Sequence, residues 1–190
     1  MTLFVGLGNP GSQYENTRHN IGFKVIDTLV DDFSARDISK NSFQGILYRS
    51  ANSFFLKPTT FMNLSGKSVL SVKHFFKIEL EDVIVIHDDI DLPFGAVRFK
   101  RGGGHGGHNG LKSVDTHITR EYMRVRVGVG KPERKSQVVE YVLHDFSQEE
   151  EKDINHLIAH VSKACKALLE GSMDDVRSKY SLKSIASLTQ

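Results

Sequence analysis

Residues 82–90 read DVIVIHDDI, and their pattern indicates the fold class. It begins with an uninterrupted apolar run from Val83 to Ile86. A strand that is covered on one face alternates apolar and polar residues, whereas a strand that is covered on both faces is apolar throughout. The run therefore predicts a central strand of a sheet that has helices packed against both faces.

On either side of this stretch, strand patterns alternate with helical ones. Short apolar runs predict strands over 2–7, 43–50, 53–57, 95–101 and 123–130. Helical spacing predicts helices from a cap at Asn16 or Thr17 to Phe33, over 64–77, after Asn109, near 136–142 and over 148–170. The second and third strands flank a turn at Ala51 and Asn52, which is typical of a hairpin. The pattern predicts an α/β fold, a three-layer sandwich with a mixed twisted sheet and helices on both faces.

Length and composition indicate a single domain over residues 1–190. The chain has 190 residues, 39% of them hydrophobic, and the polar end at about 181–190 is expected to fray. No apolar run approaches the ~20 residues of a membrane span, and no basic segment precedes an apolar one at the start. We therefore expect a cytoplasmic protein without membrane contact. Cys165, the only cysteine, lies in an apolar helical pattern and is predicted to be buried.

Charge is unevenly distributed along the chain. Residues 94–135 hold ten Lys or Arg residues against three acids, and residues 140–175 hold nine acids against three lysines. This division predicts one face that is suited to polyanions. A solvated surface on which the charges average out in three dimensions would give the same counts, so charge alone leaves both interpretations open.

Unusual polar residues follow several predicted strands. Gly8-Asn9-Pro10-Gly11 follows the first strand, Thr59–Asn63 the hairpin, and His87–Asp91 the central strand. The stretch GGGHGGHNG over 102–110 follows the strand predicted at 95–101. In open α/β sheets, ligands bind at the carboxyl ends of the strands. We therefore expect these residues to converge on one cleft.

The candidate chemistry at this cleft is acid–base catalysis by a histidine. No G-x-S-x-G elbow, Walker loop or dinucleotide-binding fingerprint is present in the usual position. His19, at a helix start, and His87, at a strand end, are the candidate bases, and we interpret His87 as a core residue. A neutral His19 could accept a proton from water if a partner fixed its tautomer, and Asp88 is the candidate partner.

A metal site is the alternative for the same residues. His105 and His108 could combine with Asp88, Asp89 and Asp91 into a mixed nitrogen and oxygen site. However, an H-x-x-H pair on a glycine loop has no fixed face, and no other metal-ligand spacing occurs. We favour a site that needs no metal and no cofactor. The two loop histidines are then expected to hydrogen-bond within the loop or to phosphate.

Several long motifs occur together in this chain. They are GLGNPG (6–11), TRHN (17–20), PTTFMNLSG (58–66), HDDIDLPFG (87–95), GGGHGGHNGL (102–111) and RVRVGVGKP (124–132). In this order the chain resembles the bacterial peptidyl-tRNA hydrolase family from residue 3 to about residue 146. The resemblance implies a monomeric esterase that cleaves the bond between a peptide and the 3′-terminal ribose of tRNA. Its partner is then peptidyl-tRNA, bound through the CCA end and the acceptor-stem phosphates.

The resemblance also implies roles for individual residues. It assigns His19 as the general base, Asp88 as its support, and Asn9 as a residue that helps to separate blocked from free amino groups. The implied substrate contacts are the amides of Asn63 and Asn109, the aromatic rings of Tyr14 and Phe61 at the tRNA end, and Lys100 and Arg126 at the tRNA backbone. The chain departs from the family pattern at Asp89, where glutamate is frequent, and Phe94 occupies a variable position at the rim of the cleft.

Two other function classes remain open at this point. An RNA-binding module without chemistry would use the basic face and stacking on Tyr14 and Phe61. It would give no reason for a histidine and an acid beside three asparagines. A metal-dependent hydrolase would use the acidic cluster of residues 88–91. Consumption of a substrate separates the first class from an enzyme, and sensitivity to a chelator identifies the second.

Overall fold

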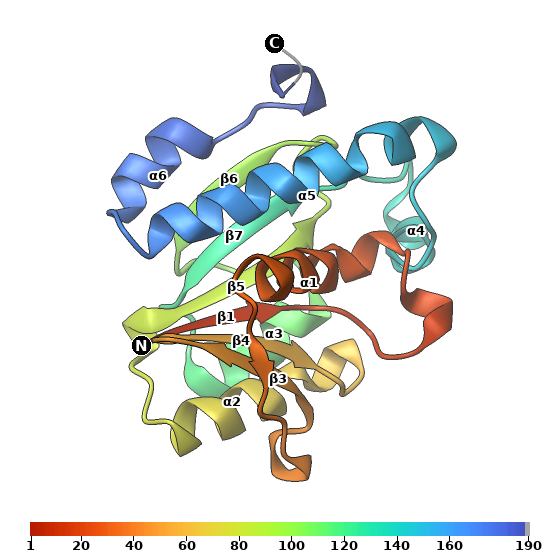
Figure 1. Ribbon diagram of the computed structural model, residues 1–190. Coiled ribbons are helices and arrows are strands. Elements are labelled where there is room, and N and C mark those ends of the chain that lie inside the picture. The colour runs from red at the N-terminus through yellow and green to blue at the C-terminus, as the bar shows by residue number, and fades with distance from the viewer. Residues whose placement is uncertain (189–190) are drawn as a thin grey trace.

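A seven-stranded sheet lies between two layers of helices in the computed structural model, which describes residues 1–188 (Figure 1). The strand order is β2-β3-β4-β1-β5-β7-β6. The strands are β1 (Thr2–Gly6), β2 (Arg36–Asp37), β3 (Gly45–Ser50), β4 (Ser53–Pro58), β5 (Val83–Asp89), β6 (Val97–Arg101) and β7 (Met123–Gly128). Strands β4, β1, β5 and β7 are parallel, and β2, β3 and β6 run antiparallel to their neighbours. The mixed sheet is confirmed.

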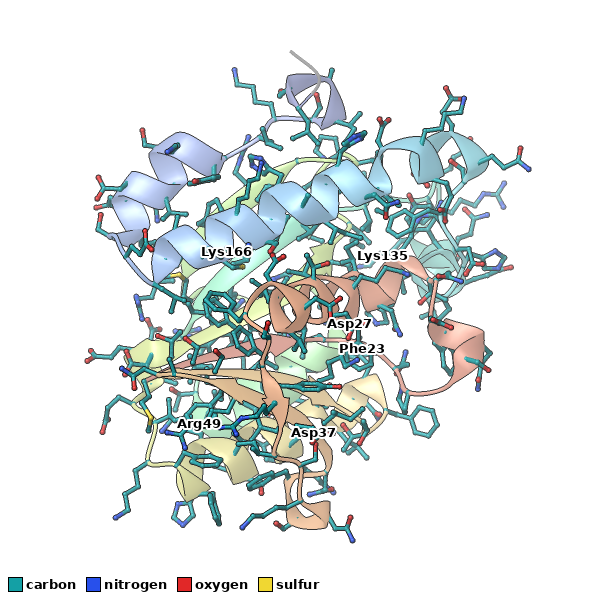
Figure 2. All side chains as sticks on the ribbon, in the orientation of Figure 1. Phe23, Asp27, Asp37, Arg49, Lys135 and Lys166 are labelled. Atoms are coloured by element: carbon teal, nitrogen blue, oxygen red, sulfur yellow. The ribbon has the colours of Figure 1, made fainter. Side chains whose placement is uncertain are left out.

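Helices cover both faces of this sheet. They are α1 (Ile21–Asp32), α2 (Ser65–Phe75), α3 (Asn109–Ile118), α4 (Val138–Val142), α5 (Gln148–Leu168) and α6 (Met173–Tyr180). Helices α1 and α5 lie on one face and α2 and α3 on the other (Figure 1). Side chains fill the space between the sheet and the helices on each face (Figure 2). From residues 1 to 188, no helix is both long and apolar enough to cross a membrane.

The run at the start of β5 is apolar because both of its faces are buried. Ile84 and Ile86 pack in the cluster under α1 and α5, and Val83 and Val85 pack in the cluster under α2 and α3. All four are at most 4% exposed. Cys165 on α5 is fully buried as predicted, and burial raises the pKa of its thiol to about 12.

The start of α1 differs from the sequence prediction. A 3₁₀ turn over Arg18–Asn20 precedes the helix, which begins at Ile21. The hydroxyl of Thr17 donates to the carbonyl of Tyr14 at 2.9 Å and does not cap the helix. This turn places the side chains of residues 18–20 in buried positions beside the sheet.

The C-terminal segment also differs from the prediction. The helix predicted over 148–170 ends at Leu168, and the separate helix α6 follows it. Leu182 is 9% exposed and pairs with Val97 at the free edge of β6. The tail expected to fray is therefore packed in its described part, because the edge strand offers it backbone hydrogen bonds. Residues 189–190 lie outside the described residues.

Two glycines bring α1 into contact with the sheet backbone. A Cβ atom on Gly22 would lie 2.5 Å from the carbonyl oxygen of Ile86, and one on Gly6 would lie 2.2 Å from the carbonyl oxygen of Gly22. Real Cβ atoms do not approach so closely, so the first turn of α1 can reach β1 and β5 only with glycine at both positions. The contact carries His19, just before α1, to the end of β5.

Candidate active site

A cleft of about 1000 Å³ lies where the parallel strands end. Its walls include Asn9 after β1, Phe61 and Asn63 after β4, His87 to Asp91 at β5, Lys131 after β7, and residues 104–109 of the glycine loop. An apolar wall is added by α4 and its end, through Val138, Val139, Val142 and Leu143. The predicted convergence of polar residues on one cleft is confirmed.

The glycine loop reaches this cleft by a route that the sequence did not predict. Strand β6 runs antiparallel to β7, so Arg101 at its carboxyl end pairs with Met123 at the amino end of β7. The loop thus starts at the amino ends of the parallel strands and crosses back to the cleft at their carboxyl ends. Residues 102, 103, 106 and 107 have φ between +58° and +93°. That backbone region explains why glycine is used there.

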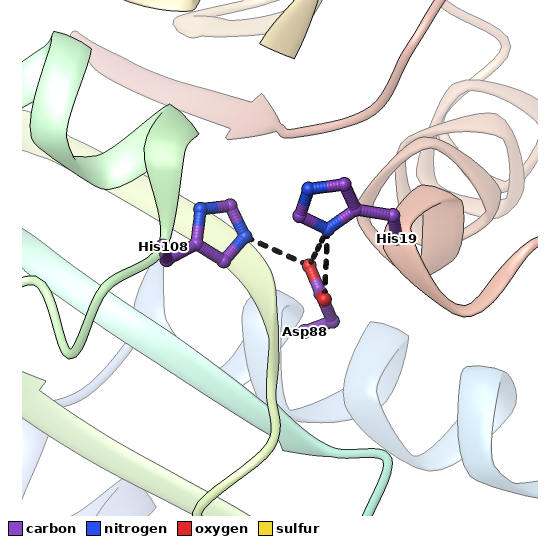
Figure 3. Close-up of side chains that lie close together, drawn as sticks. All are labelled: His19, Asp88 and His108. Atoms are coloured by element: carbon purple, nitrogen blue, oxygen red, sulfur yellow. Dashed lines mark hydrogen bonds and ion pairs between the residues drawn. The ribbon is translucent and has the colours of Figure 1, made fainter. Parts of the chain in front are cut away.

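His19 and Asp88 form a buried pair at the base of the cleft (Figure 3). Nδ1 of His19 lies 2.8 Å and 2.9 Å from the two carboxylate oxygens of Asp88. Burial alone would raise the pKa of Asp88, but two neighbouring imidazoles outweigh burial and lower it. Asp88 is therefore a carboxylate that accepts the Nδ1–H proton of His19. This assignment leaves Nε2 of His19 as the unprotonated ring nitrogen.

His108 is the second imidazole on Asp88 (Figure 3). Its Nε2 lies 2.8 Å from Oδ1 of Asp88, and its Nδ1 accepts the backbone N–H groups of Gly110 and Leu111 at 3.1 Å and 3.3 Å. A nitrogen that accepts two N–H groups carries no proton, so the proton of neutral His108 is on Nε2 and points at Asp88. His108 is thus both the cap of α3 and a donor to Asp88.

Sequence reasoning missed this role of His108. We expected a hydrogen bond within the loop or to phosphate; Nδ1 of His108 does bond to nearby backbone, but its Nε2 bonds to Asp88. The available signal was its position close to the start of the helix predicted after Asn109, where a side-chain acceptor can cap the first turn. His105 does follow the expectation, since its Nδ1 accepts the backbone N–H of Gly107 at 3.0 Å.

The potential metal ligands are grouped differently from the set considered on sequence. Within residues 1–188, the potential ligands that cluster are His19, Asp88 and His108, whose ligand atoms lie within 4.8 Å of one another. Asp89 instead pairs with Arg126 and accepts the backbone N–H of Asp91. A metal ion between the three clustered residues would have to displace both imidazole protons from Asp88.

His87 is buried beside this cluster. It is 2% exposed, and its Nδ1 donates to the carbonyl oxygen of Asp88 at 2.7 Å. Burial, followed by the nearby His108, lowers the pKa of His87 to about 4. Its Nε2 has no hydrogen-bond partner in the part of the chain that the structure describes. His87 is therefore a neutral core histidine, as interpreted, although only one of its nitrogens is satisfied.

Asn9 is held in the wall of the cleft by three hydrogen bonds. Its backbone N–H donates to Oδ1 of Asn20 at 2.8 Å, and its carbonyl accepts from Nδ2 of Asn20 at 2.9 Å. The side-chain oxygen of Asn9 accepts the N–H of Met62 at 2.8 Å, so the NH₂ group is the donor that Asn9 offers to the cleft. Asn20, 2% exposed, is a positioning residue that sequence reasoning did not single out.

The remaining predicted substrate residues lie mostly at the rim. Asn63 and Asn109 are exposed in the cleft wall, and Phe61 is 58% exposed beside them. Lys100 is exposed at the rim as well. Tyr14 is the exception, because it lies on a 3₁₀ turn that does not contribute to the wall of this cleft.

Arg126 lines the cleft but is already paired. Its Nε donates to Oδ2 of Asp89 at 2.8 Å, and its side chain is 27% exposed. Asp89 thereby holds the Arg126 guanidinium in the wall of the cleft. The two terminal nitrogens of the guanidinium are not part of that bond and can donate to an anion.

Comparisons with known proteins point to one family. The family model of peptidyl-tRNA hydrolases matches residues 3–187. A peptidyl-tRNA hydrolase of Sulfurovum sp. (strain NBC37-1) is 77% identical over 188 residues, 99% of this chain and 100% of that protein. One from Sulfurimonas denitrificans is 57% identical over 95% of this chain and 97% of its own length. The crystal structure of peptidyl-tRNA hydrolase from Acinetobacter baumannii matches with a TM-score of 0.92 at 35% identity, covering 97% of this chain and 96% of that one. The chain belongs to the peptidyl-tRNA hydrolase family.

Proposed function

We propose that this chain hydrolyses the ester bond between a peptide and the 3′-terminal ribose of tRNA, with His19 as the general base. The observation that carries the proposal is the hydrogen bond of 2.8 Å from Nδ1 of His19 to Asp88. This bond directs the basic Nε2 lone pair away from Asp88, and His19 lines the cleft. A histidine oriented by a buried carboxylate can accept a proton from water in the transition state.

The proposed reaction has two steps. In the first, water attacks the ester carbonyl carbon while Nε2 of His19 takes one of its protons. In the second, the bond from carbon to the ribose O3′ breaks, and His19 returns that proton to O3′. The products are free tRNA and a peptide with a free carboxylic acid, which keeps the second water proton until it ionises in solution. Asp88 stays ionised throughout and stabilises the positive charge that His19 carries between the two steps.

Asn9 is the proposed donor to the negative oxygen of the tetrahedral intermediate. Its side-chain oxygen is used by Met62, so the amide orientation is fixed and the NH₂ group is directed to the substrate. A pre-oriented neutral donor needs no reorganisation when charge develops on the substrate. The same group can pair with the carbonyl oxygen of a blocked amino group, in line with the role in discrimination that the resemblance implied.

Binding of tRNA is proposed to use the basic rim and the exposed ring of Phe61. Lys100, Arg126, Lys131 and Lys135 all line the cleft. A ring that is 58% exposed at the mouth of a basic cleft can stack on an unpaired base of a tRNA end. Contacts to phosphate carry little sequence information, which suits an enzyme that accepts many tRNAs.

We also propose, as the sequence led us to expect, that the protein is a cytoplasmic monomer.

The alternative of an RNA-binding module is less well supported. A binding module has no use for a buried carboxylate that orients an imidazole towards the cleft, whereas an enzyme with a histidine base uses such a carboxylate to orient that base. The metal-dependent alternative would place an ion between His19, Asp88 and His108 and remove the orienting hydrogen bonds. We favour catalysis without a metal ion or other cofactor.

The test is a hydrolysis assay with an N-acetyl-aminoacyl-tRNA and its unblocked counterpart, each with and without a chelator. The proposal expects cleavage of the blocked substrate only, at a rate that the chelator does not change. Tight binding of tRNA without cleavage would instead support the binding module. Activity lost in chelator and restored by Zn²⁺ or Mg²⁺ would support the metal-dependent reaction.

A further inference from the structure

A buried arginine, Arg124 on β7, holds the start of the glycine loop. Its side chain is 2% exposed. Nη1 donates to the carbonyl of Gly104 at 2.6 Å, and Nη2 donates to the carbonyl of Gly103 at 3.1 Å and to Oδ1 of Asp115 at 3.0 Å. One guanidinium therefore joins the strand, the loop and helix α3, which follows the loop.

A second buried residue fixes the orientation of this guanidinium. Tyr122 is fully buried, and its hydroxyl donates to the same oxygen of Asp115 at 2.6 Å. The guanidinium carbon of Arg124 lies 4.9 Å from the centre of the Tyr122 ring. Burial and the bond to Asp115 raise the pKa of Tyr122, so its hydroxyl stays a donor. A buried ion pair with additional hydrogen bonds has one well-defined geometry.

The loop between Arg124 and the cleft has little other support. The hydrogen bonds in the middle of the loop stay within the loop. The N–H of Gly107 donates to Nδ1 of His105 at 3.0 Å, and the N–H of His108 donates to the carbonyl of His105 at 3.0 Å. Gly103, Gly106 and Gly107 have positive φ and leave the backbone many alternative conformations when it is not tethered. The bond from His108 to Asp88 is the tether at the far end.

We propose that Arg124 is a positioning residue that sets the glycine loop so that His108 reaches Asp88 and Asn109 faces the cleft. The effect on turnover rests on the proposed function, whereas the effect on His108 does not. Lysine cannot replace arginine in this role, because its three donors share one nitrogen. The planar guanidinium spreads its donors over two carbonyls and one carboxylate.

The test compares Arg124→Lys with the matched control Arg98→Lys. Arg98 lies on the neighbouring strand β6 and also donates to backbone carbonyls, those of Val97 and Leu182, but it is not part of the cleft. The first readout is the proton NMR signal of Nε2–H in His108, recorded on the free protein after thermal unfolding has shown that the variant folds. We expect this signal to shift or exchange away in Arg124→Lys and to persist in Arg98→Lys.

The second readout is turnover of blocked aminoacyl-tRNA in a double-mutant cycle with His108→Gln. Arg124→Lys should lower kcat by about tenfold to a hundredfold, and the double variant should lose no more than the worse single variant. An unchanged His108 signal in folded Arg124→Lys, or losses that multiply, would overturn the proposal. If Arg124→Lys does not fold, Asp115→Asn releases the guanidinium with the same expected shift of the His108 signal. A parent chain without hydrolase activity would refute the proposed function but would leave the NMR result decisive for Arg124.

Discussion

The start of α1 and the start of α3 each bring one histidine to Asp88, and they present opposite nitrogens of the ring. His19 gives its Nδ1 to the carboxylate, and His108 gives its Nε2. The backbone accounts for the difference, because the N–H groups at the first turn of α3 occupy Nδ1 of His108. One carboxylate can therefore prepare two imidazoles for different tasks. His19 keeps a basic nitrogen for the cleft, whereas both nitrogens of His108 are used inside the protein.

Removing each imidazole in turn tests whether the two histidines have different roles. His19→Ala should lower kcat by ~10²–10⁴, the usual contribution of a general base. His108→Ala should lower it by about tenfold to a hundredfold, because it only displaces Asp88 and the loop. Steady-state hydrolysis of blocked aminoacyl-tRNA measures both, with His156→Ala on the exposed surface of α5 as control. Equal losses for the two variants would show that the histidines act as one unit.

Asn9 permits a substitution that separates donor from acceptor. Asn9→Asp keeps an oxygen for the N–H of Met62 but removes the NH₂ donor, whereas Asn9→Ala removes both. Both variants should lower kcat by about 10²–10³, since that is the effect of losing one oxyanion donor. If only Asn9→Ala lost activity, the residue would act by holding Met62 and not by contacting the substrate.

The third imidazole of the site, His87, gives an expectation for stability against pH. Its pKa is about 4 in the folded chain against 6.5 for an unperturbed histidine. The unfolded chain therefore binds this proton first as the pH falls, and folding stability should decrease by about 3 kcal/mol between pH 6.5 and 4. Urea unfolding across this range should show a smaller decrease for His87→Asn than for the parent or His156→Asn. Parallel pH curves for the parent and His87→Asn would contradict the expectation.

The smallest expected effect concerns the rim, away from the two histidines. Lys100→Glu should weaken tRNA binding and reduce the slope of its affinity against salt by roughly one, as for the loss of one phosphate contact. The turnover of bound substrate should change little, in contrast to the His19 variant. Lys163→Glu, on the exposed face of α5, is the matched control. A salt slope that Lys100→Glu leaves unchanged would place the tRNA on another surface.

The sequence was sufficient to predict the layers and the convergence on one cleft, because both depend on local patterns. The apolar run before His87 required a strand buried on both faces. Polar residues that follow parallel strands had to lie together at the carboxyl ends of those strands. The resemblance then selected His19 and Asp88. The partner of His108 could not be predicted in this way. It depends on the antiparallel direction of β6 and on the anchoring of the loop by Arg124, which are both tertiary features.

Two further differences have the same origin. The tail after α6 is polar, but the backbone of Leu182 hydrogen-bonds to Val97 at the open edge of β6. No local sequence pattern indicates this contact. Asn20 holds Asn9 through the close contact of α1 with the sheet, which depends on Gly6 and Gly22. The candidate reactive residues could therefore be named from the sequence and the resemblance, whereas their supports become visible only when distant segments are placed together.

Asp88 holds its two histidines in opposite tautomers, which leaves Nε2 of His19 as the proposed base. Heteronuclear NMR of the imidazole nitrogens at neutral pH measures this directly, without a substrate. We expect the His19 ring to be protonated at Nδ1 with a lone pair at Nε2, and the His108 ring to show the reverse. A His19 ring protonated at Nε2 would contradict the account, because its cleft-facing nitrogen would then have no lone pair with which to accept a proton from water.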